Sequence, residues 1–245
     1  MNKRQETAMS QPEPVNYRQI YHQILNHLSI DERVAMALGA VGDLLQAFCF
    51  DQNEQVIIAV ISNQTFGLEQ ARLIAEHHHN GASLDHLTKT PNFISDSAVR
   101  SHLLKNRAST ALVLKRIFLI LDLFHLHNVA SGQEATEQAK MQARDALRKK
   151  FDQSTPEQRV HFIINTEGRC LRFFYKMKMG PETADLLGKH EYTKFILVRN
   201  LLVFPGLPPQ VLRGMSKSPV IWRNNEYRRR ILGHTNCPMD VKQKR

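Results

Sequence analysis

Apolar residues recur at helical spacing along most of this chain. Residues 54–61 follow the three-and-four spacing of one helix face, and residues 68–78 and 112–126 repeat it. Alternating apolar and polar residues, which would indicate strands, are scarce. The pattern therefore predicts an all-α protein built from short helices in series, an order typical of stacked helical hairpins.

Two sequence signals mark where helices begin. Ser29 is followed by Glu32, and Thr155 is followed by Gln158, so each pair can form a capping box. Pro156 stands at the first helical position, where its missing N–H costs little. We expect helices to begin after Ser29 and Thr155. We also expect Asn80-Gly81 to end a helix.

The two capping boxes open an internal repeat. A shift of 126 residues aligns Ser29 with Thr155 and Gly42 with Gly168, and a shift of 128 aligns Thr90-Pro91 with Ser218-Pro219. Residues 29–110 and 155–238 are interpreted as diverged copies of one helical unit. Two long helices, at 109–127 and 133–151, would bridge the copies, with a hinge at 128–132. The predicted organisation is a disordered lead (1–16), a first helical-repeat unit (17–128), a bridging helix (129–154), a second unit (155–238) and a basic tail (239–245).

Several turns carry a family resemblance. They are Ser62-Asn63-Gln64-Thr65, Thr88-Lys89-Thr90-Pro91, Pro205-Gly206-Leu207-Pro208, Ser216-Lys217-Ser218-Pro219 and Thr235-Asn236-Cys237-Pro238. Each resembles the Pro-Asn-Thr-Pro turn of bacterial leucine-rich-repeat-variant and HEAT-like α-solenoids. The resemblance implies an internally duplicated, HEAT-like α-solenoid with a scaffold or binding role. It supplies no catalytic residues.

The cysteines and the apolar stretches of the sequence indicate the cellular compartment that the chain suits. The three cysteines form an odd, widely spaced set, which argues against disulfides and zinc modules and favours a reducing cytoplasm. Residues 1–16 are polar and lack an apolar signal core. The apolar stretch at 111–126 is interrupted by Lys115, Arg116 and Asp122, so we expect a buried helix and no membrane span.

Candidate catalytic and metal-binding residues are few. His77, His78 and His79 are consecutive, so on a helix their side chains point roughly 100° apart and cannot face one metal. We interpret them as a polar helix end. No phosphate-binding glycine loop or nucleophile elbow is present. The sequence predicts no enzyme, metal or cofactor, although a base-repair enzyme using a cleft aspartate and aromatic residues on a HEAT-like scaffold stays open.

Positive charge is concentrated near the C-terminus. The chain has 33 Lys and Arg against 23 Asp and Glu, a net charge of +10, and residues 209–245 supply +7 of it. Aromatic residues stand beside arginines there, a combination that can bind phosphate and stack on bases. The candidate binding residues are Arg213, Lys217, Trp222, Arg223, Tyr227, Arg228, Arg229 and Arg230. A second basic cluster at 144–150 is explained by the helix dipole alone.

Three interpretations of the basic segment stay open: a solvated terminal cap, a surface for an acidic protein, and a surface for nucleic acid. The first functional hypothesis is a non-enzymatic helical-repeat adaptor that binds a protein partner. The alternative is a nucleic-acid backbone binder that uses the basic C-terminal repeat, for which affinity should fall steeply with salt. The oligomeric state is left open by the sequence.

Overall fold

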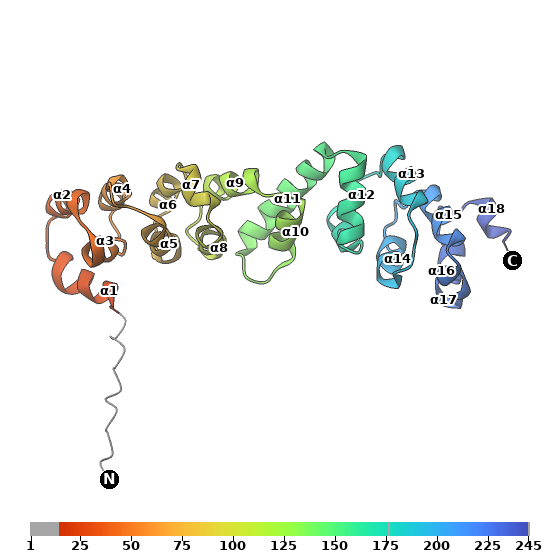
Figure 1. The fold of residues 1–245 in the computed structure, drawn as a ribbon, viewed down its shortest axis with the longest axis horizontal. Helices are drawn as coiled ribbons and strands as arrows, with labels where there is room; N and C mark the ends of the chain where they lie inside the picture. Colours follow the sequence, from red (N-terminus) through yellow and green to blue (C-terminus); the bar gives the residue numbers. More distant parts are fainter. Residues whose placement is uncertain (1–14, 176, 245) are drawn as a thin grey trace, which may run out of the picture. The chain divides into compact units, whose positions relative to one another are not determined.

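The computed structural model describes residues 15–175 and 177–244. Every regular element in these ranges is a helix, which confirms the all-α prediction (Figure 1). Most of the polar lead expected at 1–16 lies outside the described residues. None of the described helices is long and apolar enough to cross a membrane.

The chain divides into two compact units. Unit 1 comprises Met1–Ile117 and Glu134–Thr136, and unit 2 comprises Phe118–Gln133 and Glu137–Arg245. The short segment 134–136 returns to unit 1, where the Thr136 N–H donates to the Leu104 carbonyl at 3.0 Å. Each unit has its own buried apolar core, so each is described separately below.

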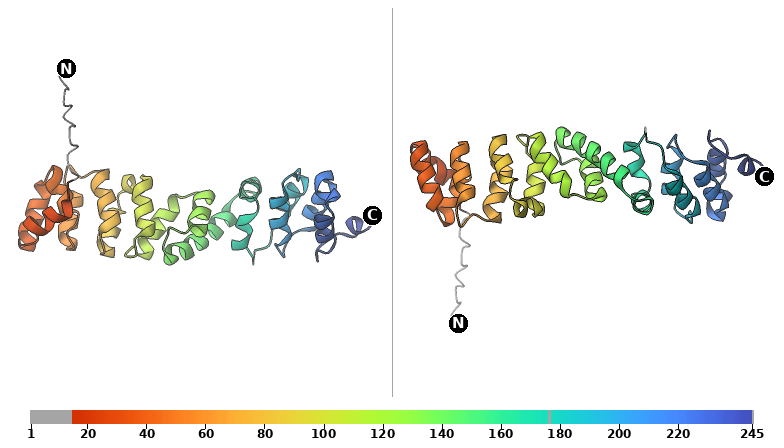
Figure 2. Two further views of the ribbon diagram at one scale, coloured as in Figure 1. Left: turned by 90° about the horizontal axis from the view of Figure 1, so that it is seen from below. Right: turned by 90° about the horizontal axis from the view of Figure 1, so that it is seen from above.

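Unit 1 is a series of short helices that follow one another in chain order (Figures 1 and 2). Its most extensive packing joins α2 to α4 and α5 to α8. Val56, Ile57 and Val60 are fully buried, as their spacing predicts. The elements are α1 (Tyr17–Ile20), the π-helical turn η1 (Tyr21–Leu25), α2 (Ile30–Gly39), α3 (Gly42–Phe48), α4 (Glu54–Ser62), α5 (Leu68–His77), α6 (Gly81–Leu87), α7 (Pro91–Ser95), α8 (Ser97–Lys105) and α9 (Ala111–Ile120), which crosses the unit boundary.

Two buried asparagines hold the helix pairs of unit 1 together in the same way. The Asn63 side-chain amide, at the end of α4, donates to the carbonyls of Ala37 and Ala40 at the end of α2. The Asn106 amide, at the end of α8, donates to the carbonyls of Ala75 and His78 at the end of α5. In both cases the amide satisfies carbonyls that a helix end leaves without a donor.

Unit 2 has helices of more varied length around an aromatic core. Its main packing joins α10 to α11, α12 to α13 and α13 to α15. Phe151 stacks on Phe174 with ring centroids 4.2 Å apart. The elements are α10 (Leu123–Ser131), α11 (Glu137–Gln153), α12 (Pro156–Asn165), the 3-10 turn η2 (Arg169–Phe173), α13 (Pro181–Lys189), α14 (Phe195–Leu202), α15 (Pro209–Lys217), α16 (Pro219–Arg223), α17 (Asn225–Leu232) and α18 (Met239–Lys242).

Both expected capping boxes are present. The Ser29 side chain accepts from the Glu32 N–H while the Glu32 carboxylate accepts from the Ser29 N–H, and Thr155 and Gln158 do the same. Gly42 and Gly168 both adopt positive φ, at 56° and 74°. That left-handed region is open to glycine at little cost, because glycine has no Cβ.

Three helix boundaries differ from the sequence prediction. The single helix expected at 109–127 is two helices, because Asp122 accepts a hydrogen bond from the His125 N–H and caps a new helix, α10. That helix continues to Ser131, so most of the hinge expected at 128–132 is helical. Asn80 does not end a helix but begins one, since its side chain accepts from the Ala82 N–H at the start of α6.

Candidate functional site

The predicted C-terminal patch is distributed over three helices of unit 2. Arg213 and Lys217 lie on α15, Trp222 and Arg223 on α16, and residues 227–230 on α17; these three helices contact one another. Arg213 already forms an ion pair, because its guanidinium donates two hydrogen bonds to the Asp240 carboxylate at 2.8 and 2.9 Å. These bonds lower the pKa of Asp240.

Other members of the patch are also partly engaged. Tyr227 stacks on Phe195 with ring centroids 5.0 Å apart, and Arg230 lies 3.8 Å from the Glu226 carboxylate. Arg228 donates to the Asn225 side chain at 3.2 Å, and Trp222 is half-buried. Lys217, Arg223 and Arg229 are exposed and form no ion pair with a described residue. Lys217, Arg223 and Arg229 are therefore the exposed cations of the patch that described carboxylates do not neutralise.

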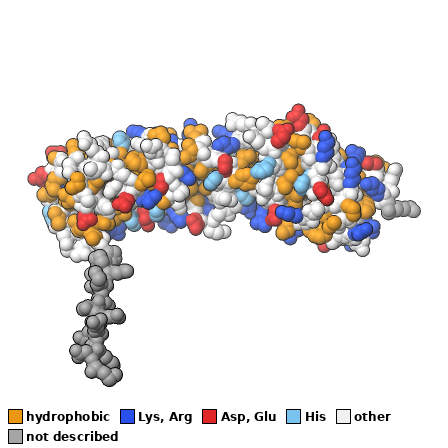
Figure 3. Space-filling model, in the orientation of Figure 1, with side chains coloured by type: hydrophobic (Ala, Val, Ile, Leu, Met, Phe, Trp, Pro, Cys, Tyr) orange, Lys and Arg blue, Asp and Glu red, His pale blue; other side chains and the backbone are white. Residues whose placement is uncertain are grey.

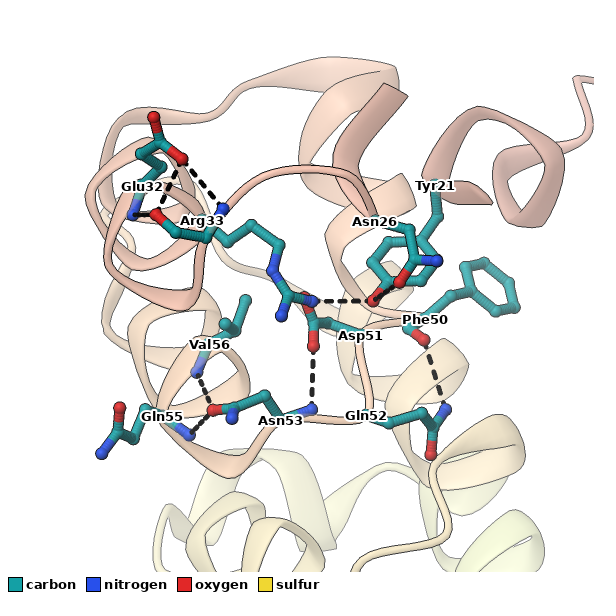
Figure 4. Close-up of polar contacts among 11 residues, drawn as sticks. Tyr21, Asn26, Glu32, Arg33, Phe50, Asp51, Gln52, Asn53, Gln55 and Val56 are labelled. Carbon is teal, nitrogen blue, oxygen red and sulfur yellow. Dashed lines mark hydrogen bonds and ion pairs between the residues drawn. The ribbon is translucent and has the colours of Figure 1, made fainter. Parts of the chain in front are cut away.

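A pocket of about 530 Å³ lies in unit 1, and its walls include Arg33 and Asp51. These two residues form a buried ion pair (Figure 4). Arg33 reaches from α2 and donates to the Asp51 carboxylate at 2.5 Å and to the Tyr21 hydroxyl at 2.9 Å. The Tyr21 hydroxyl donates to the Asn26 side chain at 3.4 Å. The second Asp51 oxygen accepts from the Asn53 N–H at 2.8 Å.

This network connects the N-terminal helices to α2 and to the turn before α4. The Asp51 side chain has no exposed surface, and both of its oxygens are bonded. Burial and the negative charge of Asp51 raise the pKa of Tyr21. A base-repair reaction would need a cleft aspartate that faces its substrate, whereas this carboxylate faces Arg33. The arrangement is that of a structural ion pair.

The histidine run ends helix α5, as predicted at His77, but its middle member is not a polar surface residue. His78 is fully buried, and its Nδ1 accepts from the Asn80 N–H at 3.0 Å. Burial lowers the pKa of His78 to about 4, with a further lowering by His79. His78 is therefore neutral near pH 7. Among the described residues, no group of three or more His, Cys, Asp or Glu side chains could hold a metal ion.

The three cysteines are buried and unpaired. Burial raises the pKa of the Cys49 thiol and raises that of Cys170 to about 12. Thiols with such values stay protonated near pH 7 and are poor nucleophiles.

Unit 2 contains a second concentration of cations, which we name the arginine cleft. Two pockets, of about 560 and 770 Å³, share Ser131 and Arg172 in their walls. Helix α11 contributes cations at four-residue intervals, which places them on one face of the helix. The residues that define the arginine cleft are Lys140, Arg144, Arg148, Arg169, Arg172, Phe173 and Tyr175.

The cations of the arginine cleft differ in how they are neutralised. Lys140 pairs with Glu137, Arg148 with Asp145 and Arg169 with Glu167, at 2.8, 3.0 and 2.8 Å. By contrast, Arg144 and Arg172 form no ion pair with a described residue. Their guanidinium carbons lie 5.8 and 4.7 Å from the centre of the Phe173 ring.

Two further residues shape the chemistry of the arginine cleft. Tyr175 is 68% exposed, although large aromatic side chains are usually buried. Burial lowers the pKa of His127, and the positive charges of Arg172 and Arg169 lower it further. The cleft therefore presents permanent guanidinium charges beside an exposed aromatic ring and a neutral imidazole.

Sequence reasoning missed this cleft. From sequence, the helix dipole alone explains the basic cluster at 144–150, and Arg169 and Arg172 stand about 25 residues further along the chain in a segment with no charge run. Packing of η2 against α11, through the Arg148 Nε bond to the Phe173 carbonyl at 2.8 Å, brings the two sets together.

The charge of the two units differs sharply. Unit 2 has 22 Lys and Arg against 11 Asp and Glu, a net charge of +11, whereas unit 1 has 11 against 12. Lys and Arg surfaces are frequent over the C-terminal helices in Figure 3.

Comparison of the chain with protein-family models, curated proteins and solved structures finds no match.

Proposed function

We propose that this chain is a non-enzymatic helical-repeat adaptor whose unit 2 binds a nucleic-acid backbone. The observation that carries the proposal is the net charge of +11 on unit 2, together with arginines that form no ion pair with a described residue. Such a surface favours a polyanion, because each phosphate that it contacts releases bound counterions. Guanidinium groups suit phosphate through their paired donors.

The adaptor role rests on a proposed HEAT-like repeat architecture with an internal duplication. At a shift of 126 residues, both capping boxes and the positive-φ glycines Gly42 and Gly168 correspond. At a shift of 128, α7 corresponds to α16, since each is five residues long and begins with proline. Helices α8 and α17 follow them, capped by the side chains of Asp96 and Asn224. Repeated helical units of this kind provide extended binding surfaces.

The first test is fluorescence anisotropy of labelled RNA, single-stranded DNA and duplex DNA, titrated with the full chain across salt concentrations. We expect tight binding at low salt and a steep linear fall of log affinity with log salt concentration. Binding that is absent at low salt, or that does not change with salt, would contradict the proposal.

Two double variants provide a matched control for charge. Arg223→Glu with Arg229→Glu alters unit 2, and Arg107→Glu with Lys115→Glu alters unit 1 by the same total charge. All four side chains are exposed and form no ion pair with a described residue. We expect the unit 2 variant to lose at least about 10-fold in affinity, because two phosphate contacts are lost. The unit 1 variant should lose much less, and equal losses would argue against a localised surface.

A protein partner is the second candidate, and one feature of unit 1 supports it. Ile30, Leu38 and Val41 are 40, 52 and 63% exposed along the length of α2 and the turn that follows it. An exposed apolar stripe of this kind is typical of protein–protein contacts. Affinity capture with wild-type chain and with Leu38→Glu should then recover one defined protein with wild type only. Identical recovery with both would remove the stripe as a docking surface.

A further inference from the structure

We propose that the arginine cleft binds single-stranded nucleic acid, with Arg144 and Arg172 contacting phosphates and Tyr175 stacking on a base. The inference rests on the proposed function and names the site and the form of the ligand. It also moves the centre of binding away from the C-terminal patch, where Arg213 is tied to Asp240 and Tyr227 to Phe195.

The first step is the arrangement of cations. Arg144 and Arg148 stand one turn apart on α11, and four residues of helix span about 6 Å. Arg172 comes from η2 and lines both pockets of the cleft. The cations therefore line a path between two elements, which suits a chain of phosphates better than a single small anion.

The second step is an unmet bonding requirement. The Nε of Arg144 is buried and has no hydrogen-bond partner among the described residues. A charged donor in that position is costly unless an acceptor reaches it. Arg144 and Arg172 also lie against the same aromatic ring, so their charges repel each other. A phosphate in the cleft would accept from the terminal nitrogens of the two guanidinium groups and offset the repulsion.

The third step is the exposed ring. Tyr175 lines the 770 Å³ pocket together with Arg172, His127 and Asn128, and pockets of this size hold small-molecule ligands. Bases of a single strand stack on exposed aromatic rings, whereas a duplex keeps its base faces covered. The neutral His127 and the Asn128 amide provide hydrogen-bonding groups at the same pocket wall.

The cleft is not a general consequence of the repeat. Under the 126-residue correspondence, the positions of Arg169, Arg172 and Tyr175 are occupied in the first copy by Asp43, Gln46 and Cys49. The first copy therefore has one acidic and two uncharged residues where the second has two arginines and an exposed tyrosine. This contrast makes the site a property of unit 2.

The test uses the full chain and a fluorescein-labelled 12-nucleotide oligouridylate, with duplex DNA and a polyglutamate peptide as competing probes. Tyr175→Ala should weaken oligouridylate binding about 5- to 150-fold, the range expected for loss of one stacked base. It should leave duplex affinity within about twofold, because a duplex offers no free base face. Tyr175→Phe, which keeps the ring, should bind like the wild type.

Arg172→Glu should weaken oligouridylate binding by at least about 10-fold and make its dependence on salt less steep. Lys115→Glu in unit 1 makes the same charge change on an exposed side chain and is the matched control. Arg172 and Tyr175 are both exposed, and thermal unfolding followed by circular dichroism checks that each variant folds.

The outcomes separate the site from the proposed function. If oligouridylate binds with a steep salt dependence but Tyr175→Ala and Arg172→Glu behave like Lys115→Glu, the site is wrong and the function stands. If no nucleic acid binds at low salt, both are wrong. Binding of polyglutamate alone, weakened by Arg172→Glu, would assign the cleft to an acidic protein and overturn the inference.

Discussion

The two units differ in how many of their arginines are neutralised by a carboxylate. In unit 1, Arg33, Arg72 and Arg116 each form an ion pair with an aspartate: Asp51, Asp96 and Asp85, respectively. In unit 2, Arg144, Arg172, Arg223 and Arg229 form no ion pair with a described residue. Unit 2 also has paired arginines, at Arg148, Arg169, Arg213 and Arg230, so the two units differ in how many arginines are left without a carboxylate.

The difference follows from how many carboxylates each unit has and where they lie. Unit 1 has about as many acidic as basic residues, and Asp51 is fully buried opposite Arg33. Unit 2 has twice as many basic as acidic residues. Its carboxylates at Asp145, Glu167 and Asp240 each form an ion pair with an arginine. The remaining cations must be solvated or neutralised from outside the unit.

The largest expected effect is the loss of the buried pair in unit 1. Asp51→Ala leaves the Arg33 charge buried without a carboxylate and should lower the free energy of unfolding by about 3–5 kcal/mol. Urea denaturation measures the loss, and hydrogen exchange followed by mass spectrometry should place it in the peptides of unit 1.

The matched control is Asp240→Ala, which removes the carboxylate from the exposed pair with Arg213 in unit 2. Exposed pairs contribute little because water screens both charges. We expect almost no change in stability. Equal losses in the two variants would contradict the contrast between a buried ion pair in unit 1 and an exposed ion pair in unit 2.

The second effect is a pH dependence located in unit 1. His78 has a folded pKa of about 4, below its ordinary value of 6.5, so folding disfavours its protonated form. The free energy of unfolding therefore keeps its full contribution from His78 above pH 6.5. As the pH drops from 6.5 towards 4, it falls by about 2–3 kcal/mol. Unfolding measured between pH 7 and pH 4 checks this.

His127, His190 and His234 in unit 2 also have lowered pKa values and contribute in the same direction. A His78→Gln variant separates the contributions, because it cannot be protonated at this position. Its stability should fall less between pH 6.5 and pH 4 than that of the wild type. An unchanged slope would show that His78 is not the group responsible.

The smallest effect compares the two positive-φ glycines, one in each unit. Gly42→Ala places a Cβ at positive φ but in open space, and should cost about 1 kcal/mol. Gly168→Ala adds crowding, since its Cβ would lie 3.1 Å from the Asn200 Cβ on α14, and should cost about 2 kcal/mol. Urea denaturation of both variants tests the order. A larger loss at Gly42 would contradict the tight packing around Gly168.

Much of the fold was predictable because its signals are local. The capping boxes at Ser29 and Thr155 and the buried faces of α4 and α5 were each predicted from fewer than a dozen neighbouring residues. The misassigned boundary at Asp122 has the same origin. An aspartate inside an apolar helical pattern is compatible both with a continuous helix and with a new N-cap.

The candidate site was less predictable than the fold. The C-terminal patch is contiguous in sequence, so its charge could be read directly, but the partners that occupy Arg213 and Tyr227 could not. The arginine cleft joins Arg144 to Arg172, which are 28 residues apart, and no local pattern links them.

Three properties follow from the sequence alone: the chain is helical, many of its helices begin at recognisable caps, and it carries a large positive charge. These properties depend on hydrogen bonds and apolar spacing within a few residues, and on a simple count of side chains. Tertiary packing, in contrast, establishes which cations are neutralised, which histidine is buried and which arginines share a cleft. Those outcomes depend on burial and on distances between residues far apart in the chain, because both ion pairing and desolvation act over a few ångströms of space.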